Sequence, residues 1–138
     1  MYLVLQREGD EKPTRWRYDF KKLMSVERED IERRTGRNFA AFTQDVLHGN
    51  SLCRRALLFT YLRRDHPKTK FEDVDFGWDE LKLEYSKQEF ESIRENILES
   101  MHGDELAAAL AAIDKNLEDA FDDAEAAAEG KAQLPIAE

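Results

Sequence analysis

The sequence predicts a mainly α fold of the α+β class, in which an N-terminal β-hairpin precedes a helical bundle and a C-terminal amphipathic helix rich in alanine and acidic residues. Two observations support this prediction. Apolar residues alternate with polar ones near the N-terminus, whereas from residue 25 onward they mostly recur at helical spacing. Charged residues make up 37% of the chain and hydrophobic residues 41%, a balance typical of soluble helical proteins with large solvated faces.

The length sets the expected domain organisation. A chain of 138 residues is the size of one domain. We expect a single mainly helical domain, which includes the hairpin, over residues 1–101, an amphipathic helix over 104–129, and a flexible tail over 130–138. The tail is expected because the last residues of a chain usually fray.

The hairpin is predicted from two segments, residues 2–7 and 14–20. In the second segment, Trp16, Tyr18 and Phe20 share one side, and charged residues occupy the other. This is the period of a half-buried strand. A glycine and an aspartate between the segments favour a turn.

The first helix is expected to start at Ser25, because serine is a favoured helix cap. Acidic residues early in the segment and arginines late in it match the helix dipole. Glu29 with Arg33 and Asp30 with Arg34 form two favourable pairs at a spacing of four.

A second, short helix is expected between Gly36 and Gly49, since glycine commonly ends helices. It places three apolar residues on one face: Phe39, Phe42 and Val46.

The third helix is expected from Asn50 or Ser51 to about Arg64, because Pro67 disfavours helical geometry in the residue before it. Its middle, residues 56–62, is apolar almost all round. Such a helix usually lies at the centre of a core.

Residues 68–77 are expected to form mostly loop. After this loop, Leu81, Leu83 and Tyr85 alternate with charged residues, which predicts a short strand.

The next helix has the clearest start signal. Ser86 and Glu89 have the spacing of a capping box, in which each side chain accepts a hydrogen bond from the backbone of the other residue. The helix that follows carries one apolar stripe: Phe90, Ile93, Ile97 and Met101.

After Gly103 the composition shifts to alanine and acid. Apolar residues recur there with the period of a short heptad seam: Leu106, Leu110, Ile113 and Leu117. This helix either docks on the domain or pairs with a helix of another chain, so self-association stays open.

The reactive side chains form no local catalytic or metal-binding pattern. His48, His66 and His102 stand far apart, and Cys53 lies within an apolar helical pattern. Each glycine is isolated, so the sequence has no phosphate-binding loop. We therefore expect a protein that is not an enzyme and that uses no cofactor and no metal.

The charge is unevenly distributed. Residues 1–70 carry 16 Lys/Arg and 10 Asp/Glu, whereas residues 71–138 carry 5 and 20. This polarity permits head-to-tail association and opposes binding to nucleic acid. We expect the arginine pairs at 54–55 and 63–64 to be neutralised by three acidic residues: Glu72, Asp73 and Asp75.

The sequence also favours a cytosolic location. No stretch approaches the roughly 20 apolar residues that cross a bilayer, and the start lacks the pattern of a signal peptide. We expect no association with membranes.

Short motifs give the chain a resemblance to a known family. The apolar run 56–62 is closed by Arg63-Arg64-Asp65-His66-Pro67 and followed by Phe71-Glu72-Asp73-Val74-Asp75-Phe76. Upstream, a charged helix over residues 25–34 ends in Thr35-Gly36, before Phe39 and Phe42. Over about residues 16–101 the chain resembles the tail assembly chaperones of long-tailed phages, especially those of actinobacteria.

The resemblance implies a role in phage tail assembly. Such a chaperone binds the tape measure protein in the host cytoplasm, keeps it soluble without ATP, and is absent from the mature virion. Many of these chaperones are made in two lengths by a programmed ribosomal frameshift. Glu129-Gly130-Lys131 matches the footprint of a slippery codon run. This chain would then be the short form, and a longer form would recruit tail tube subunits.

A protein that holds an amphipathic helix needs an apolar groove, and helix-rich folds form such grooves between adjacent helices. The candidate partner-binding residues are equally suited to a core: Leu57, Tyr61, Ile93, Ile97, Leu106, Leu110, Ile113 and Leu117. Two other function classes stay open. One is a virion structural or connector protein, and the other is a small helical regulator that binds DNA or a repressor.

Overall fold

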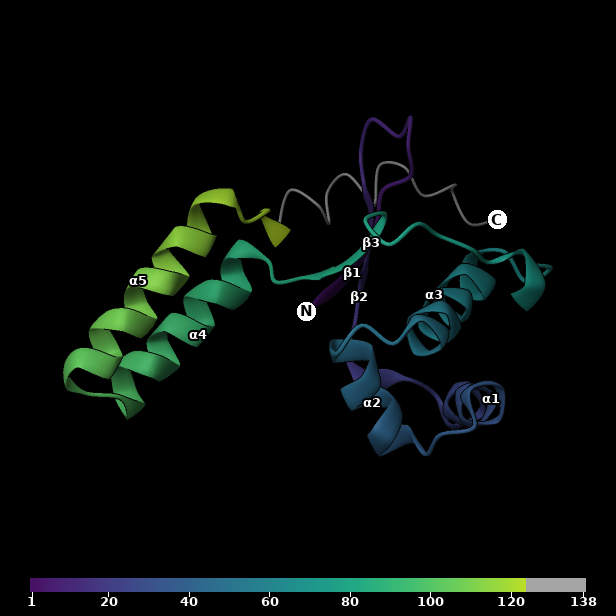
Figure 1. Cartoon of the computed structure of the whole chain (residues 1–138), viewed down its shortest axis with the longest axis horizontal. Helices are drawn as coiled ribbons and strands as arrows, with labels where there is room; N and C mark the ends of the chain where they lie inside the picture. Colours follow the sequence, from purple (N-terminus) through teal and green to yellow (C-terminus); the bar gives the residue numbers. More distant parts are fainter. Residues whose placement is uncertain (124–138) are drawn as a thin grey trace, which may run out of the picture. The chain divides into compact units, whose positions relative to one another are not determined.

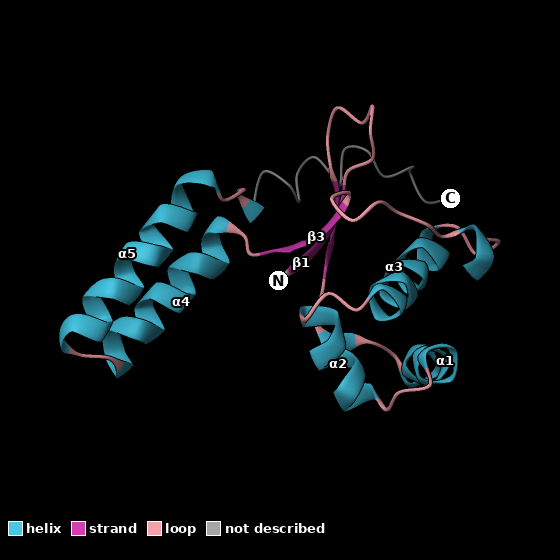
Figure 2. Ribbon diagram, in the orientation of Figure 1, coloured by secondary structure: helices cyan, strands magenta, loops and turns pink. Residues whose placement is uncertain are grey.

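The computed structural model describes residues 1–123 and has a mainly α fold with a small antiparallel sheet, as the sequence predicts (Figures 1 and 2). The end of the predicted helix 104–129, the predicted tail 130–138 and the Glu129-Gly130-Lys131 footprint lie outside the described residues.

The sheet contains three strands in the order β2-β1-β3. β1 is Tyr2–Leu5, β2 is Thr14–Arg17 and β3 is Leu81–Glu84. The adjacent β1 and β2 confirm the predicted hairpin. The alternating segment that begins at Leu81 is the third strand, on the other side of β1. Next to this pair, the amide of Gln6 donates to the carbonyl of Glu80 at 2.9 Å.

The chain divides into two compact units. The sheet–helix unit comprises Leu3–Leu83. The hairpin unit comprises Met1–Tyr2 and the chain from Glu84 onward. The domain expected over residues 1–101 extends across this division.

In the sheet–helix unit, α1 is Ser25–Thr35. The prediction that Ser25 caps this helix is wrong, because Met24 occupies the cap position. Glu27 performs the capping by accepting a hydrogen bond from the Met24 amide through Oε1 at 2.9 Å. The helix ends at Gly36, whose φ of 67° is the left-handed conformation common at helix C-termini.

Asparagine side chains start the next two helices. α2 is Phe39–Leu47 and α3 is Ser51–Asp65. Asn38 and Asn50 each accept a hydrogen bond from the backbone amide three residues on, at 2.8 and 3.0 Å. Each of the three helices α1 to α3 packs against the other two.

The middle of α3 lies at the centre of the core, as its continuous apolar run predicts. Leu57 and Leu58 are both 0% exposed. Thr60 is buried with them because its hydroxyl donates to the Ala56 carbonyl at 2.9 Å, which satisfies the polar group inside the helix. The buried residues of α3 are Cys53, Ala56, Leu57, Leu58, Phe59, Thr60 and Tyr61.

The hairpin unit is built from α4, Lys87–Ser100, and α5, Gly103–Asp119, which pack against each other (Figure 1). The capping box predicted for α4 is present. The Ser86 amide donates to Glu89 Oε1 at 3.0 Å, and the Glu89 amide donates to Ser86 Oγ at 3.1 Å.

α5 ends earlier than the predicted helix 104–129. The helix stops at Asp119, and the backbone of Ala120 is extended. The chain then returns to the start of α4, where the carbonyl of Phe121 accepts from the Lys87 amide at 2.7 Å. This contact satisfies one of the amides that a helix N-terminus leaves without an internal partner.

Candidate functional site

Side chains of α1, α3 and the loop after α3 form a cluster of arginines and aromatic rings in the sheet–helix unit. The guanidinium of Arg34 lies 4.6 Å from the ring centre of Phe59 and 4.9 Å from that of Phe71. Arg55 lies 4.1 Å from the ring centre of Phe71 and donates at 2.7 Å to the carbonyls of both Phe71 and Val74. The cluster therefore fixes the loop after α3 to the outside of that helix.

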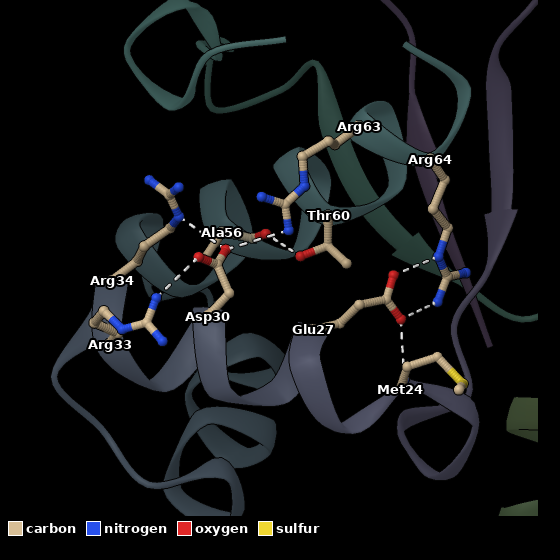
Figure 3. Close-up of polar contacts among 9 residues, drawn as sticks. All are labelled: Met24, Glu27, Asp30, Arg33, Arg34, Ala56, Thr60, Arg63 and Arg64. Carbon is tan, nitrogen blue, oxygen red and sulfur yellow. Dashed lines mark hydrogen bonds and ion pairs between the residues drawn. The ribbon is translucent and has the colours of Figure 1, made fainter. Parts of the chain in front are cut away.

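Asp30 joins α1 to α3 at the edge of this cluster (Figure 3). Its side chain, 13% exposed, accepts from Arg34 Nε at 2.9 Å and lies 3.5 Å from Arg63 Nη2 and 3.8 Å from Arg33 Nη1. The predicted pair Asp30–Arg34 is thereby confirmed. Three guanidinium groups surround one carboxylate, which explains how that carboxylate is accommodated with little exposure.

Glu27 makes the second link between the two helices. Arg64 donates to its carboxylate from Nε at 2.7 Å and from Nη2 at 2.6 Å (Figure 3). These hydrogen bonds hold the pKa of Glu27 below its ordinary value. The same carboxylate accepts from the Met24 amide, so one side chain both caps α1 and binds α3.

These contacts correct the expected partners of the arginine pairs. Arg63 and Arg64 bind acidic residues of α1, and Arg55 binds two backbone carbonyls. Arg54 likewise donates from Nε to the carbonyl of Val46 at 2.9 Å. The acceptors are therefore not the predicted Glu72, Asp73 and Asp75. A sequence gives no direct signal for backbone carbonyls as acceptors, so the partners of Arg54 and Arg55 could not be predicted from it.

The candidate partner-binding residues fall into two groups. Leu57 and Tyr61 belong to the core of the sheet–helix unit, at 0% and 4% exposure. The Tyr61 ring stacks on Trp16, with ring centres 6.3 Å apart, and burial raises the pKa of its phenol. These two side chains are therefore packed inside the unit, where a partner has no access to them.

The other six residues lie together in the hairpin unit. Arg94 Nε binds Asp114 Oδ1 at 3.0 Å, and the Lys87 amide binds the Phe121 carbonyl, so α4 and α5 run antiparallel in a defined register. This register places the apolar stripe of α4 beside the seam of α5. The six residues are Ile93, Ile97, Leu106, Leu110, Ile113 and Leu117.

The apolar stripes of the hairpin are only partly covered. α4 has no fully buried residue, and within α5 only Ile113 is buried, at 7% exposure. Leu98 of α4 is 45% exposed. The other members of the two stripes are only half-buried: Phe90, Ile93, Ile97, Met101, Leu106, Leu110 and Leu117. Leu98 was missed from the sequence because it falls outside the periodic stripe.

Contacts at the open end of the hairpin hold the two helices together. The Ser86 hydroxyl donates to Asp123 Oδ2 at 2.8 Å, and the Asp123 amide donates to Gln88 Oε1 at 2.8 Å. The ring of Tyr2 meets that of Phe121 edge-on, with centres 5.0 Å apart. The N-terminal ammonium group forms an ion pair with Glu89. The hydrogen bonds of Asp123 with Ser86 and Gln88 could not be predicted from the sequence, because Asp123 lies more than thirty residues away from them.

Residues 1–123 contain one cysteine and no group arranged to bind a metal. Cys53 is fully buried, and burial raises the pKa of its thiol, which favours the unreactive protonated form. Within that range, no group of three or more His, Cys, Asp or Glu residues is arranged to hold a metal ion. None of the described helices is long and apolar enough to span a membrane.

Comparison with models of protein families, with curated proteins and with solved structures finds no match to this chain.

Proposed function

We propose that this chain is a tail assembly chaperone that holds helical segments of a tape measure protein during phage tail assembly. The observation that supports this role best is the antiparallel α4–α5 hairpin, whose apolar stripes are only partly covered. A third amphipathic helix completes such a pair by burying the remaining apolar surface, which is how helix-in-groove recognition works. The tape measure protein is proposed as the client because residues 16–101 resemble phage tail assembly chaperones.

The proposed mechanism is stoichiometric binding without catalysis. Burial of apolar client surface against the hairpin stabilises the complex by roughly 25 cal/mol per Å² of area removed from water, before the entropic cost of association. No nucleotide is needed, because the growing tail tube would displace the chaperone from its client. In this proposal the chain works in the host cytoplasm and is absent from the mature virion, and a longer form would recruit tube subunits.

The arginines of the sheet–helix unit favour binding of a protein client over binding of nucleic acid. Four of its arginines, at positions 54, 55, 63 and 64, are engaged by carbonyls or carboxylates of the same unit. Guanidinium groups used in this way contribute less to a phosphate-binding surface. This weakens the case for a DNA-binding regulator. A virion structural or connector protein differs in one measurable respect, since it would remain in purified particles.

Co-expression tests the proposal. The chain is produced together with the tape measure protein of the same phage, and the soluble fraction of the tape measure protein is quantified. Leu98→Glu changes an exposed apolar residue of the hairpin, and Val26→Glu makes the same kind of change in α1, where Val26 is 71% exposed. The native chain and the Val26 variant should both increase the soluble fraction. The Leu98 variant should lose much of the effect.

Each failure has a separate meaning. If the native chain leaves the tape measure protein insoluble, the proposed function is wrong. If the Leu98 variant works as well as the native chain, the function stands but the side of α4 that carries Leu98 is not the site.

A further inference from the structure

Four exposed residues between β2 and α1 form a small surface that is both basic and apolar, which we call the basic patch. They are Phe20, Lys21, Lys22 and Met24. The first three form the short 3₁₀ helix η1, Phe20–Lys22. Phe20 is 46% exposed and Met24 is 68% exposed, and the ammonium of Lys21 lies 5.9 Å from the centre of the Phe20 ring. Positive charge therefore lies directly beside accessible apolar surface.

The patch is held in place by the core and keeps its cations free. Leu23 is 4% exposed and anchors the segment, while Lys22 before it and Met24 after it are exposed. The carboxylate of Asp19 caps η1 by accepting from the Lys21 amide at 3.1 Å. Within residues 1–123 neither lysine forms an ion pair. Both ammonium groups are therefore available to a partner.

A complementary surface lies on α4. Glu91, Glu95 and Glu99 are exposed and follow one another at a spacing of four, so they form one row along the helix, the glutamate row. Leu98 borders this row: at about 100° per residue, it lies about 20° from Glu91 and about 60° from Glu95 around the helix axis. Among the described residues none of the three glutamates has an ion-pair partner.

We infer that the basic patch of one copy of the chain binds the glutamate row of a second copy. Phe20 and Met24 would contact Leu98 and the methylene groups of the glutamates, while the two lysines pair with the carboxylates. Complementary charge raises the association rate and determines which faces meet. This inference goes beyond the proposed function, which concerns a client and not a second copy.

The other exposed acidic segment is a poorer partner for the patch. Glu72, Asp73 and Asp79 lie in the loop before β3, within the sheet–helix unit. Residues 3–83 carry 17 Lys/Arg and 15 Asp/Glu, a net charge of +2, whereas residues 84–123 carry 3 and 12, a net charge of −9. The field around the hairpin unit therefore attracts a basic surface, and the field around the sheet–helix unit does not.

The contact joins two different surfaces, so the association is head-to-tail. Each pair of copies retains one unoccupied basic patch and one unoccupied glutamate row, and a third copy can bind to either. The uneven charge of the sequence permits head-to-tail association in general. The basic patch and the glutamate row give that association a location.

Sedimentation equilibrium of the full chain tests the inference. At about 0.05 M salt the weight-average mass should rise with concentration past that of a dimer, and at about 0.5 M salt the association constant should fall at least about tenfold, because salt screens exposed charges. A mass that stays at one chain, or that rises equally at both salt concentrations, would overturn the inference.

Two neutralised variants locate the contact. Lys21→Gln/Lys22→Gln removes the charge of the basic patch, and Glu91→Gln/Glu95→Gln/Glu99→Gln removes that of the glutamate row. Each variant alone should associate with itself at least about tenfold more weakly than the native chain. Mixed together, the two variants retain one intact patch and one intact row, so they should form a 1:1 pair that does not grow further.

Two control variants make the same changes in charge elsewhere. Lys68→Gln/Lys70→Gln and Glu72→Gln/Asp73→Asn/Asp79→Asn alter exposed positions of the sheet–helix unit and should associate as the native chain does. Equal weakening in the controls, or a mixture that forms no pair, would overturn the inference. All these variants keep Leu98, so solubilisation of the tape measure protein reports separately on the proposed function.

Discussion

The guanidinium of Arg64 in α3 binds both carboxylate oxygens of Glu27 in α1, at 2.7 and 2.6 Å (Figure 3). Glu27 also accepts from the Met24 amide at the start of its own helix. Because one carboxylate serves the cap and the helix–helix contact together, the start of α1 and its packing on α3 depend on the same side chain.

Replacing Glu27 should separate these two roles. Glu27→Gln keeps an oxygen for the Met24 amide but loses the charge, and should lower the free energy of unfolding by about 1 kcal/mol. Glu27→Ala loses the cap as well, and should cost about 1 kcal/mol more. Urea denaturation measures both. Equal stability of the two variants would show that the capping hydrogen bond contributes nothing.

The Glu27–Arg64 pair also predicts a pH dependence. The pKa of Glu27 is lowered below 4.5 in the folded chain, mainly by hydrogen bonds from Arg64. The pair's stabilisation is therefore complete above the unfolded pKa and is lost as pH falls through the lower folded value. The stability difference between the native chain and Glu27→Gln should shrink between pH 7 and about pH 3. A constant difference would contradict the assignment.

Arg55 should be sensitive even to a conservative change. Its guanidinium donates to the carbonyls of Phe71 and Val74 while stacking on the Phe71 ring. The single ammonium of Arg55→Lys cannot donate to both carbonyls in the same geometry. We therefore expect the free energy of unfolding, measured by urea denaturation, to fall by about 1–3 kcal/mol. The control is Arg33→Lys, because the Arg33 side chain is 75% exposed and should tolerate the change. If Arg55→Lys and Arg33→Lys lower the free energy of unfolding by similar amounts, the two hydrogen bonds of Arg55 to backbone carbonyls have no special role.

Ser86 provides a test within the hairpin unit. Its hydroxyl accepts from the Glu89 amide and donates to Asp123. Ser86→Ala should cost about 1–2 kcal/mol and speed hydrogen exchange in the first turn of α4. Ser51→Ala is the control, since Asn50 already caps α3. Unchanged exchange in α4 would mean that the helix start does not depend on the cap.

Alanine substitutions at Gly49 and Gly36 distinguish the effect of backbone strain from that of contact with a side chain. Gly36 and Gly49 both have positive φ, so alanine at either position should cost about 1 kcal/mol. A Cβ at Gly49 would also lie 3.3 Å from the edge of the Trp78 ring, whereas one at Gly36 meets nothing within 4 Å. With Trp16 replaced by Phe, only Gly49→Ala should shift the fluorescence of Trp78. A similar shift in Gly36→Ala would contradict the placement of Trp78.

The sequence predicts the local elements better than the contacts between them. The apolar run of α3, the capping box at Ser86 and the alternation from Leu81 are local patterns, and each corresponds to an element of the structure. The end of α5 at Asp119 was not predicted, and just after it Phe121 contacts Tyr2 and Lys87, which are distant in the sequence. Periodicity alone cannot reveal such a contact.

For the candidate site too, the sequence predicts local patterns but not the contacts between elements. Periodicity identifies apolar stripes without showing which are covered, so Leu57 in the core and Ile97 in the hairpin look alike in the sequence. Their burial differs because α3 is surrounded by neighbours in its unit, whereas among the helices described in residues 84–123 α4 packs on α5 alone. The partial exposure of the α4 and α5 stripes becomes visible only in the fold.

The proposed chaperone role is tested by isolating a tagged form of the full chain from host cells while tails assemble, and by quantifying the proteins that copurify with it. We expect the tape measure protein to copurify in a fixed ratio and the tagged chain to be missing from finished particles. Recovery of the chain in finished particles at a constant copy number, with no tape measure protein bound to it during assembly, would rule out the chaperone role and identify a structural component of the virion.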